Sequence, residues 1–233
     1  FRVAYQFQFQ GLPALQASRH LSEIAECVLR ECLKIAEQDM QARHGSVPQS
    51  AFLVLGYGSL GAGNLSFNSD LDAVFLSESE SMAISSGAQA LEATRYFLRL
   101  AQKLIALLSL STPSGSLYEV DIRLRPDGAK GLMVSSMASF SQYQRQRAWV
   151  WEWQALVRAR AVAGDPELSV AFEQLRLQIL QQPRQAGHLH DEVQAMRRRM
   201  RTELDRSDTG RVDLKHGAGA LTDIEFLLQA LLL

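Results

Sequence analysis

The feature that most limits the possible folds of this chain is a short gap between a glycine-rich turn and a pair of aspartates. A strand-like run over residues 51–55 leads into GYGSLG at residues 56–61, the spelling of a dinucleotide-binding fingerprint. Only AGNLSFNS, residues 62–69, separates this motif from Asp70. A parallel crossover helix needs a dozen or more residues, and Gly, Asn and Ser favour turns over helix interiors. The spacing therefore argues against a dinucleotide-binding fold and favours a tight phosphate-holding turn.

Hydrophobic periodicity predicts an α+β fold, a small mixed sheet with flanking helices followed by a helical bundle. Apolar residues three and four apart predict a helix over 19–43, with Ser18 as its N-cap and Gly45 at its end. Buried or alternating runs predict strands over 51–55, 71–76 and 116–124, and a short extended piece over 211–214. Further helices are expected over 87–110, 141–163, 167–180, 191–204 and 220–233.

This order of elements divides the chain into an N-terminal helical segment over 1–48, a sheet domain over 49–138 and a helical domain over 139–233. Phe1 is not a start methionine, and residues 231–233 form an abrupt apolar end. We therefore expect a piece of a longer protein, with the helical domain truncated at its C-terminus.

Charge and cysteine content narrow the functional class. The formal net charge is −1 and no basic stripe is visible, which argues against nucleic-acid polymerisation. No apolar run approaches 18 residues, so we expect no membrane span. Cys27 and Cys32 point to different helix faces and suit neither a disulfide nor a metal site, so we expect a reducing, cytoplasmic setting.

Three aspartates are candidate metal ligands. Asp70 and Asp72 are two apart on a predicted strand and project from the same face, and Asp121 lies on the non-core face of another predicted strand. If the strands are neighbours, the carboxylates converge and repel one another unless divalent cations neutralise them. Mg²⁺ prefers a few carboxylates together with substrate phosphates, so this pattern predicts a nucleoside triphosphate held with two metal ions.

Phosphate contacts are expected from the turn at Gly58 and Ser59, through backbone N–H groups and a hydroxyl. Arg123 and Arg125 continue the face of Asp121 and could add charged contacts. An equally open alternative is that these arginines pair with Glu119 or cap helix ends.

The Gly-Ser turn, the aspartate pair at 70 and 72 and the third aspartate at 121 resemble the polymerase-β-type nucleotidyltransferase signature. More closely, four segments in order resemble the bacterial glutamine synthetase adenylyltransferase family: GYGSLGAGNLSFNSDLDAVFL, YEVDIRLRPDGAKGLMVSS, WEWQALVRARAVAGD and GAGALTDIEF. The second, third and fourth segments look more like the half of that family that adds AMP than the half that removes it.

This resemblance implies that 49–138 is a nucleotidyltransferase domain that moves AMP from ATP to a tyrosine hydroxyl of glutamine synthetase. Asp70 and Asp72 would be ligands of both Mg²⁺ ions, and Asp121 would be a ligand of the catalytic ion and a possible proton acceptor. Gly58 and Ser59 would hold the β- and γ-phosphates. The family usually has Gly-Lys where this chain has Gly58-Ser59, so the phosphate affinity is expected to differ. A PII-type signalling protein and glutamine are the regulators that the family implies.

Other interpretations stay open. The chain could instead remove AMP by phosphorolysis, or could serve only as a nucleotide- or regulator-binding module. The basic run over 197–201 is expected to be a solvated helix face, with a partner surface as the alternative. Asp223 and Glu225 could complement a helix dipole, while the family likeness suggests an active-site role for Glu225 or Lys215.

Overall fold

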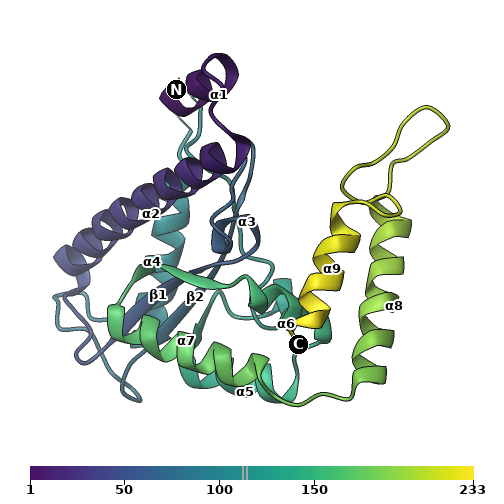
Figure 1. Cartoon of the computed structure of the whole chain (residues 1–233). Helices are drawn as coiled ribbons and strands as arrows, with labels where there is room; N and C mark the ends of the chain where they lie inside the picture. The colour runs from purple at the N-terminus through teal and green to yellow at the C-terminus, as the bar shows by residue number, and fades with distance from the viewer. Residues whose placement is uncertain (112, 114) are drawn as a thin grey trace.

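The computed structural model describes residues 1–111, 113 and 115–233, and within them a five-stranded mixed sheet forms the centre of the molecule (Figure 1). Its strands are β1 (Ala51–Gly56), β2 (Leu71–Glu78), β3 (Val120–Asp121), β4 (Val134–Ser136) and β5 (Arg160–Gly164). The order is β3-β2-β1-β5, and β4 also pairs with β2. β1 runs antiparallel to β2 and β5, whereas β3 and β4 run parallel to β2. The α+β class with a mixed sheet is thereby confirmed.

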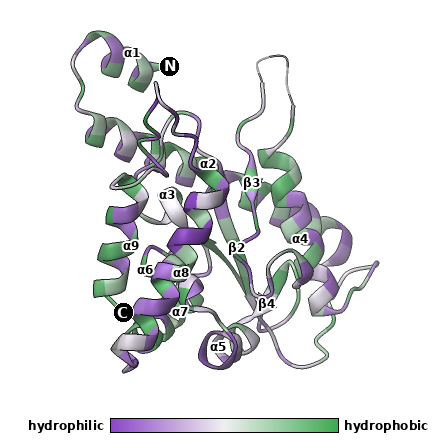
Figure 2. Cartoon of the chain, turned by 90° about the vertical axis from the view of Figure 1, so that its right-hand side faces the viewer, coloured by the Kyte–Doolittle hydropathy of each residue, from purple (hydrophilic) through white to green (hydrophobic). Residues whose placement is uncertain are grey.

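Helices surround this sheet. They are α1 (Arg2–Phe9), α2 (Ala14–His44), α3 (Gly58–Gly61), α4 (Ala93–Leu108), α5 (Met137–Gln146), α6 (Val150–Val157), α7 (Pro166–Leu180), α8 (Ala186–Leu204) and α9 (Leu221–Leu231), with a 3₁₀ turn at Gly128–Lys130. In Figure 1, α8 and α9 stand side by side at one end of the molecule, and the loop between them projects away from the sheet. Figure 2 shows α8 mostly in the hydrophilic colour. Among the described residues, every helix is too short or too polar to cross a membrane.

The sheet is buried on both faces. Along β1, Phe52 and Val54 belong to the core formed with α2 and α4, while Leu53 and Leu55 belong to a second core formed with α5, α6 and α7. This explains why β1 reads as a continuous apolar run, since successive side chains point to opposite faces. On β2, Val74 lies in the second core, so Asp72 projects to the same side of the sheet.

The predicted helix over 141–163 is wrong. The segment forms α5, then α6, and then strand β5, which pairs antiparallel with β1. Pairing with β1 completes backbone hydrogen bonds that a helix would otherwise supply, so tertiary context overrides the helical pattern. The sheet therefore extends past residue 138, where we placed the end of the nucleotidyltransferase domain.

Smaller differences concern element ends. The long N-terminal helix starts at Ala14 after Pro13, so the predicted N-cap at Ser18 is wrong, whereas its end at Gly45 is confirmed. Pro13 can begin the helix there because its fixed φ suits a helix start. The predicted helix over 87–110 begins only at Ala93, and the extended piece over 211–214 is reduced to a single bridge to Arg211.

The predicted strand over 116–124 is present only as β3. After Asp121 the chain leaves the ladder, because the guanidinium of Arg125 donates hydrogen bonds to the carbonyl oxygens of Ile122, Ala129 and Gly131. The alternating pattern therefore predicts the site of pairing with β2 but overestimates its length.

Candidate active site

The Gly58-Ser59 turn is built directly against Asp72. The chain leaves β1 and turns into the short α3, and Gly58 adopts a φ of +51°, a conformation that favours glycine. A Cβ atom at Gly58 would overlap the Oδ2 atom of Asp72. The backbone N–H of Tyr57 donates to the carbonyl oxygen of Asp72 over 2.9 Å. The turn and the first half of β2 are therefore held in contact through both backbone and side chain.

Asp72 and Asp121 lie opposite each other in the register of the parallel strands β2 and β3. Asp70 is exposed and lies one residue before β2. Burial is the first cause that raises the pKa of Asp72, and the negative charges of Asp121 and Asp70 raise it further. The three predicted carboxylates are thus near enough to act on one another electrostatically.

Arg123 is the counter-charge of Asp121 in this structure. Its Nε donates to both carboxylate oxygens at 3.0 and 2.8 Å, and its Nη2 lies 2.5 Å from Oδ2. The hydrogen bond from Arg123 is the main reason why the pKa of Asp121 is lowered. The side chain of Asp121 is 18% exposed and that of Arg123 is 79% exposed, so the guanidinium covers the carboxylate from the solvent side. The expected alternative of a Glu119 partner is not what the geometry favours.

Arg125 is engaged by the backbone of its own loop. Its three hydrogen bonds, to the carbonyl oxygens of Ile122 at 2.6 Å, Ala129 at 3.2 Å and Gly131 at 3.3 Å, fold the segment that follows β3. A role for Arg125 in phosphate binding stays a prediction, and its observed role is to shape this loop.

The donor set fits a divalent cation by chemistry and register. Carboxylate oxygens suit Mg²⁺, and Asp72 carries an unfavourable charge next to two others of the same sign. Among the described residues, no three His, Cys, Asp or Glu side chains are grouped as a ready metal-binding cluster. In this structure both carboxylate oxygens of Asp121 accept hydrogen bonds from Arg123.

Three residues without a firm role from the sequence alone, Arg158, Glu225 and Asn64, are joined by hydrogen bonds next to the Gly58-Ser59 turn. Arg158 follows α6, and its Nη1 lies 2.9 Å from Oε1 of Glu225 on α9, while its Nη2 donates to Oδ1 of Asn64 over 3.2 Å. The charge of Arg158 also lowers the pKa of Asp72. The alternation of Arg160 and Val162 before Gly164 was the sequence signal for a strand here, and it would have placed Arg158 in a loop at the sheet end.

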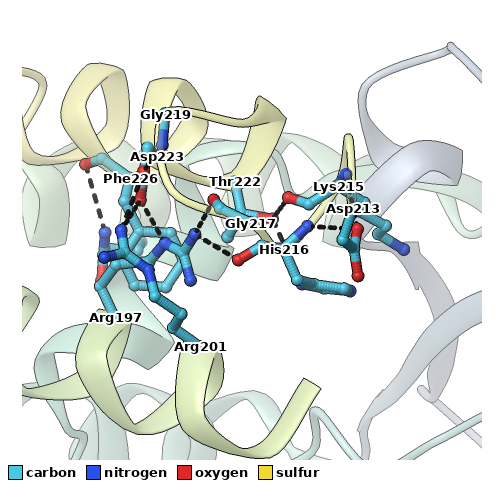
Figure 3. A network of polar contacts seen from close by, with 11 residues as sticks. Arg197, Arg201, Asp213, Lys215, His216, Gly217, Gly219, Thr222, Asp223 and Phe226 are labelled. Atoms are coloured by element: carbon cyan, nitrogen blue, oxygen red, sulfur yellow. Dashed lines mark hydrogen bonds and ion pairs between the residues drawn. The ribbon is translucent and has the colours of Figure 1, made fainter. Parts of the chain in front are cut away.

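A second polar network joins α8 to the start of α9, the helix that carries Glu225 (Figure 3). The buried Arg197 of α8 donates through Nε to Asp223 at 2.5 Å and through Nη2 to the carbonyl oxygens of His216 and Gly217. Arg201 and the backbone N–H of Gly219 also donate to Asp223. The prediction of a solvated face is therefore wrong for Arg197, because its helix packs against the turn before α9.

A family model and the similar proteins of known name all indicate the same family. Residues 1–175 match the family model described as glutamate-ammonia ligase adenylyltransferase. The chain is 53% identical over 231 residues to a protein of Xanthomonas axonopodis pv. citri (strain 306), and the alignment covers 99% of this chain and 24% of that protein. It is 54% identical over 230 residues to one of Stenotrophomonas maltophilia (strain K279a), which covers 98% of this chain and 25% of that protein.

A protein of Shewanella oneidensis is 46% identical over 232 residues, which covers 95% of this chain and 24% of that protein. All three relatives are named bifunctional glutamine synthetase adenylyltransferase/adenylyl-removing enzyme. The chain spans about a quarter of the length of these relatives.

Proposed function

Since the chain belongs to the glutamate-ammonia ligase adenylyltransferase family, we propose that it transfers AMP from ATP to a tyrosine hydroxyl of glutamine synthetase and releases pyrophosphate. The observation that carries this proposal is the contact of the Gly58-Ser59 turn with Asp72, which lies in register with Asp121. A turn that offers N–H groups next to paired carboxylates suits a triphosphate and its cations.

The proposal gives these residues the following roles. Gly58 and Ser59 would bind the β- and γ-phosphates, and Asp70, Asp72 and Asp121 would hold two Mg²⁺ ions. When bound, these ions would favour attack by the tyrosine oxygen and stabilise the leaving pyrophosphate. Arg123 already contacts Asp121, and its guanidinium is largely exposed. It can therefore leave the carboxylate of Asp121 and bind a phosphate oxygen of the nucleotide.

Proton transfer sets a condition on Asp121. A tyrosine hydroxyl has an ordinary pKa of about 10 and must lose its proton when it attacks. While Arg123 donates to Asp121, the pKa of Asp121 is lowered and the carboxylate is a poor proton acceptor. Asp121 therefore accepts the tyrosine proton only after Arg123 has moved from it.

The direct test uses ATP that is labelled at its α-phosphate, the phosphate that stays with AMP. It measures transfer of this label to unmodified glutamine synthetase in the presence of Mg²⁺. We expect label on a tyrosine with the unaltered chain, and its loss when Asp70 and Asp72 are both changed to asparagine. Asp191→Asn, at an exposed position on α8, is the matched control and should transfer label at the normal rate. Full transfer by the Asp70→Asn/Asp72→Asn protein would refute the assignment of the site.

Phosphorolytic removal of AMP from modified glutamine synthetase is the second candidate function. It is favoured by one observation, the adenylyl-removing activity in the names of the relatives. Release of ADP that depends on phosphate would support it, and the same aspartate variants should abolish that release. Label transfer without ADP release would instead assign the chain to the adding reaction.

The regulators and the cellular location of the longer protein are also part of this proposal. A PII-type signalling protein and glutamine are the regulators that we expect for the longer protein, and the cytoplasm is its expected location. A chain that served only as a binding module would bind ATP without transferring label, and retention of Asp70, Asp72 and Asp121 argues against this.

A further inference from the structure

Arg158 is fixed beside the phosphate-binding turn by its backbone. A Cβ atom at Gly61, the last residue of α3, would overlap the carbonyl oxygen of Arg158, so the two backbones are in direct contact. Two residues later, Arg160 enters β5 and pairs with Gly56 at the end of β1. The position of Arg158 is thus set by the same strand and turn that carry Gly58 and Ser59.

The side chain of Arg158 is held at this place by two partners from other parts of the chain. Asn64 accepts a hydrogen bond from Nη2 over 3.2 Å, and the backbone N–H of Asn64 donates to the carbonyl oxygen of Ser59 over 2.9 Å. Glu225 accepts from Nη1 over 2.9 Å. The guanidinium therefore lies in a chain of contacts that leads to the turn on one side and to α9 on the other.

A purely structural ion pair does not account well for this arrangement. The side chain of Glu225 is 51% exposed, and pairs that are open to solvent contribute little to stability. The side chain of Arg158 is only 21% exposed and lies near enough to Asp72 to stabilise its charged form. A guanidinium between carboxylates and a glycine-rich turn is suited to bind phosphate through two parallel hydrogen bonds.

We propose that Arg158 binds a phosphate group of the nucleotide, and that Glu225 holds the guanidinium until the nucleotide displaces it. This inference rests on the proposed function, and it adds a phosphate-binding residue and a competitor within the chain. The contact between Glu225 and Arg158 then depends on whether the site is occupied. Binding of the triphosphate breaks this contact, and α9 is no longer held to Arg158 through Glu225.

Binding experiments on the 233-residue chain test the proposal without glutamine synthetase. Dissociation constants for Mg–ATP and for inorganic tripolyphosphate are measured by calorimetry. Arg158→Met should raise both constants about tenfold or more, because a charge-assisted contact to phosphate is lost. Arg158→Lys should recover part of the affinity. Glu225→Gln should lower both constants, by up to about fivefold, the range that an exposed ion pair contributes.

Arg145→Met is the matched control. Arg145 also bridges two elements, since its Nη2 donates to Gln178 of α7 over 2.8 Å, and it lies outside the proposed site. It should leave both constants unchanged. Unchanged binding in Arg158→Met, or unchanged or weaker binding in Glu225→Gln, would overturn the proposal. If Arg158→Met does not fold, Glu225→Gln decides by the same criterion.

The outcomes separate this inference from the proposed function. Arg158-dependent binding of Mg–ATP without label transfer to glutamine synthetase would refute the transfer reaction and leave the phosphate contact standing. Label transfer with equal binding by the normal chain and Arg158→Met would refute the phosphate contact alone. A normal chain that binds neither Mg–ATP nor tripolyphosphate would refute both.

Discussion

At the scale of single residues, the missing side chain of Gly58 matters both for the backbone conformation of the turn and for the position of the Asp72 carboxylate. Its φ of +51° disfavours any side chain, and a Cβ atom would meet the Oδ2 atom of Asp72. Gly58→Ala should therefore shift Asp72 and cost about 1–2 kcal/mol of folding free energy through left-handed strain. We expect a folded protein by circular dichroism with AMP transfer reduced at least tenfold.

Gly63→Ala is the control for this substitution. Gly63 also has a positive φ, of +67°, but a Cβ atom there meets nothing within 4 Å. It should show the same small loss of stability and keep its transfer activity. Equal activity loss in both variants would mean that backbone strain, and not the contact with Asp72, disables the site.

The carboxylate of Asp72 should lower the stability of the folded protein, although the proposed reaction needs it. Its pKa is raised above the ordinary value, first by burial and then by Asp121 and Asp70, so the folded state binds protons more readily than the unfolded state. Stability therefore falls as pH rises through the interval between the unfolded and folded pKa values. Asp72→Asn removes this cost and should raise the melting temperature at pH 7 by about 2–4 °C, for a gain of about 1 kcal/mol.

The dependence of the melting temperatures on pH and on Mg²⁺ tests why Asp72→Asn should be more stable than the normal protein. The difference in melting temperature should shrink as the pH is lowered toward the ordinary pKa of an aspartate, about 4. The raised pKa of Asp72 means that its carboxylate takes up a proton in the folded protein before the pH reaches that value. Added Mg²⁺ should stabilise the normal protein more than Asp72→Asn, because a bound ion stabilises only the state that holds it. A variant that melts below the normal protein at pH 7 would contradict the argument.

At the scale of the elements, α6 links the second core to the site, and a buried carboxylate fixes its start. Glu152 accepts hydrogen bonds from the hydroxyl of Tyr143 at 3.0 Å and from the backbone N–H of Trp149 at 2.9 Å. Glu152→Ala leaves both donors without this partner and should cost about 2–3 kcal/mol in urea denaturation. Because α6 ends just before Arg158, the affinity for tripolyphosphate should fall as well.

Glu152→Gln keeps one acceptor oxygen and should lose less stability than the alanine variant. Glu167→Ala removes an exposed glutamate from the first turn of α7 and should cost about 0.5 kcal/mol or less, since only its interaction with the helix dipole is lost. An equal cost at the two positions would show that burial and hydrogen bonding of Glu152 do not set the start of α6.

The elements also show what the sequence can and cannot predict. β1 and β2 were predictable because both are buried apolar runs bounded by turn residues, and α7 was predictable from the stop at Gly164-Asp165-Pro166. The alternation of Arg160 and Val162 is too short to predict β5 by itself, because the pairing partner of this strand lies about 100 positions earlier in the chain. The register of Asp72 with Asp121 could be expected from two strands, but the contacts of Arg158 depend on β5 and α9 together.

At the scale of the whole molecule, the α8–α9 pair is attached to the sheet body through few polar contacts. Arg158 bonds to Glu225, and the side-chain amide of Gln154 on α6 donates to the carbonyl oxygen of Phe226 over 3.5 Å. Inside the pair, the buried Arg197 joins α8 to Asp223 and to the turn before α9 (Figure 3). Because Asp223 and Glu225 lie on the same helix, the ion pair of Asp223 with Arg197 helps to set the position of Glu225.

A double-mutant cycle on Arg197 and Asp223 tests this dependence. The side chains are 9% and 26% exposed, so Asp223→Ala leaves a buried guanidinium without its carboxylate and should cost about 3 kcal/mol in chemical denaturation. Adding Arg197→Met removes the stranded charge, so the double variant should lose less stability than the sum of the two single variants. Asp223→Ala should also speed proteolysis within residues 205–220, since the anchor of that loop is lost. Strictly additive costs would mean that Arg197 and Asp223 stabilise α9 independently, which would refute the coupling inferred from their contact.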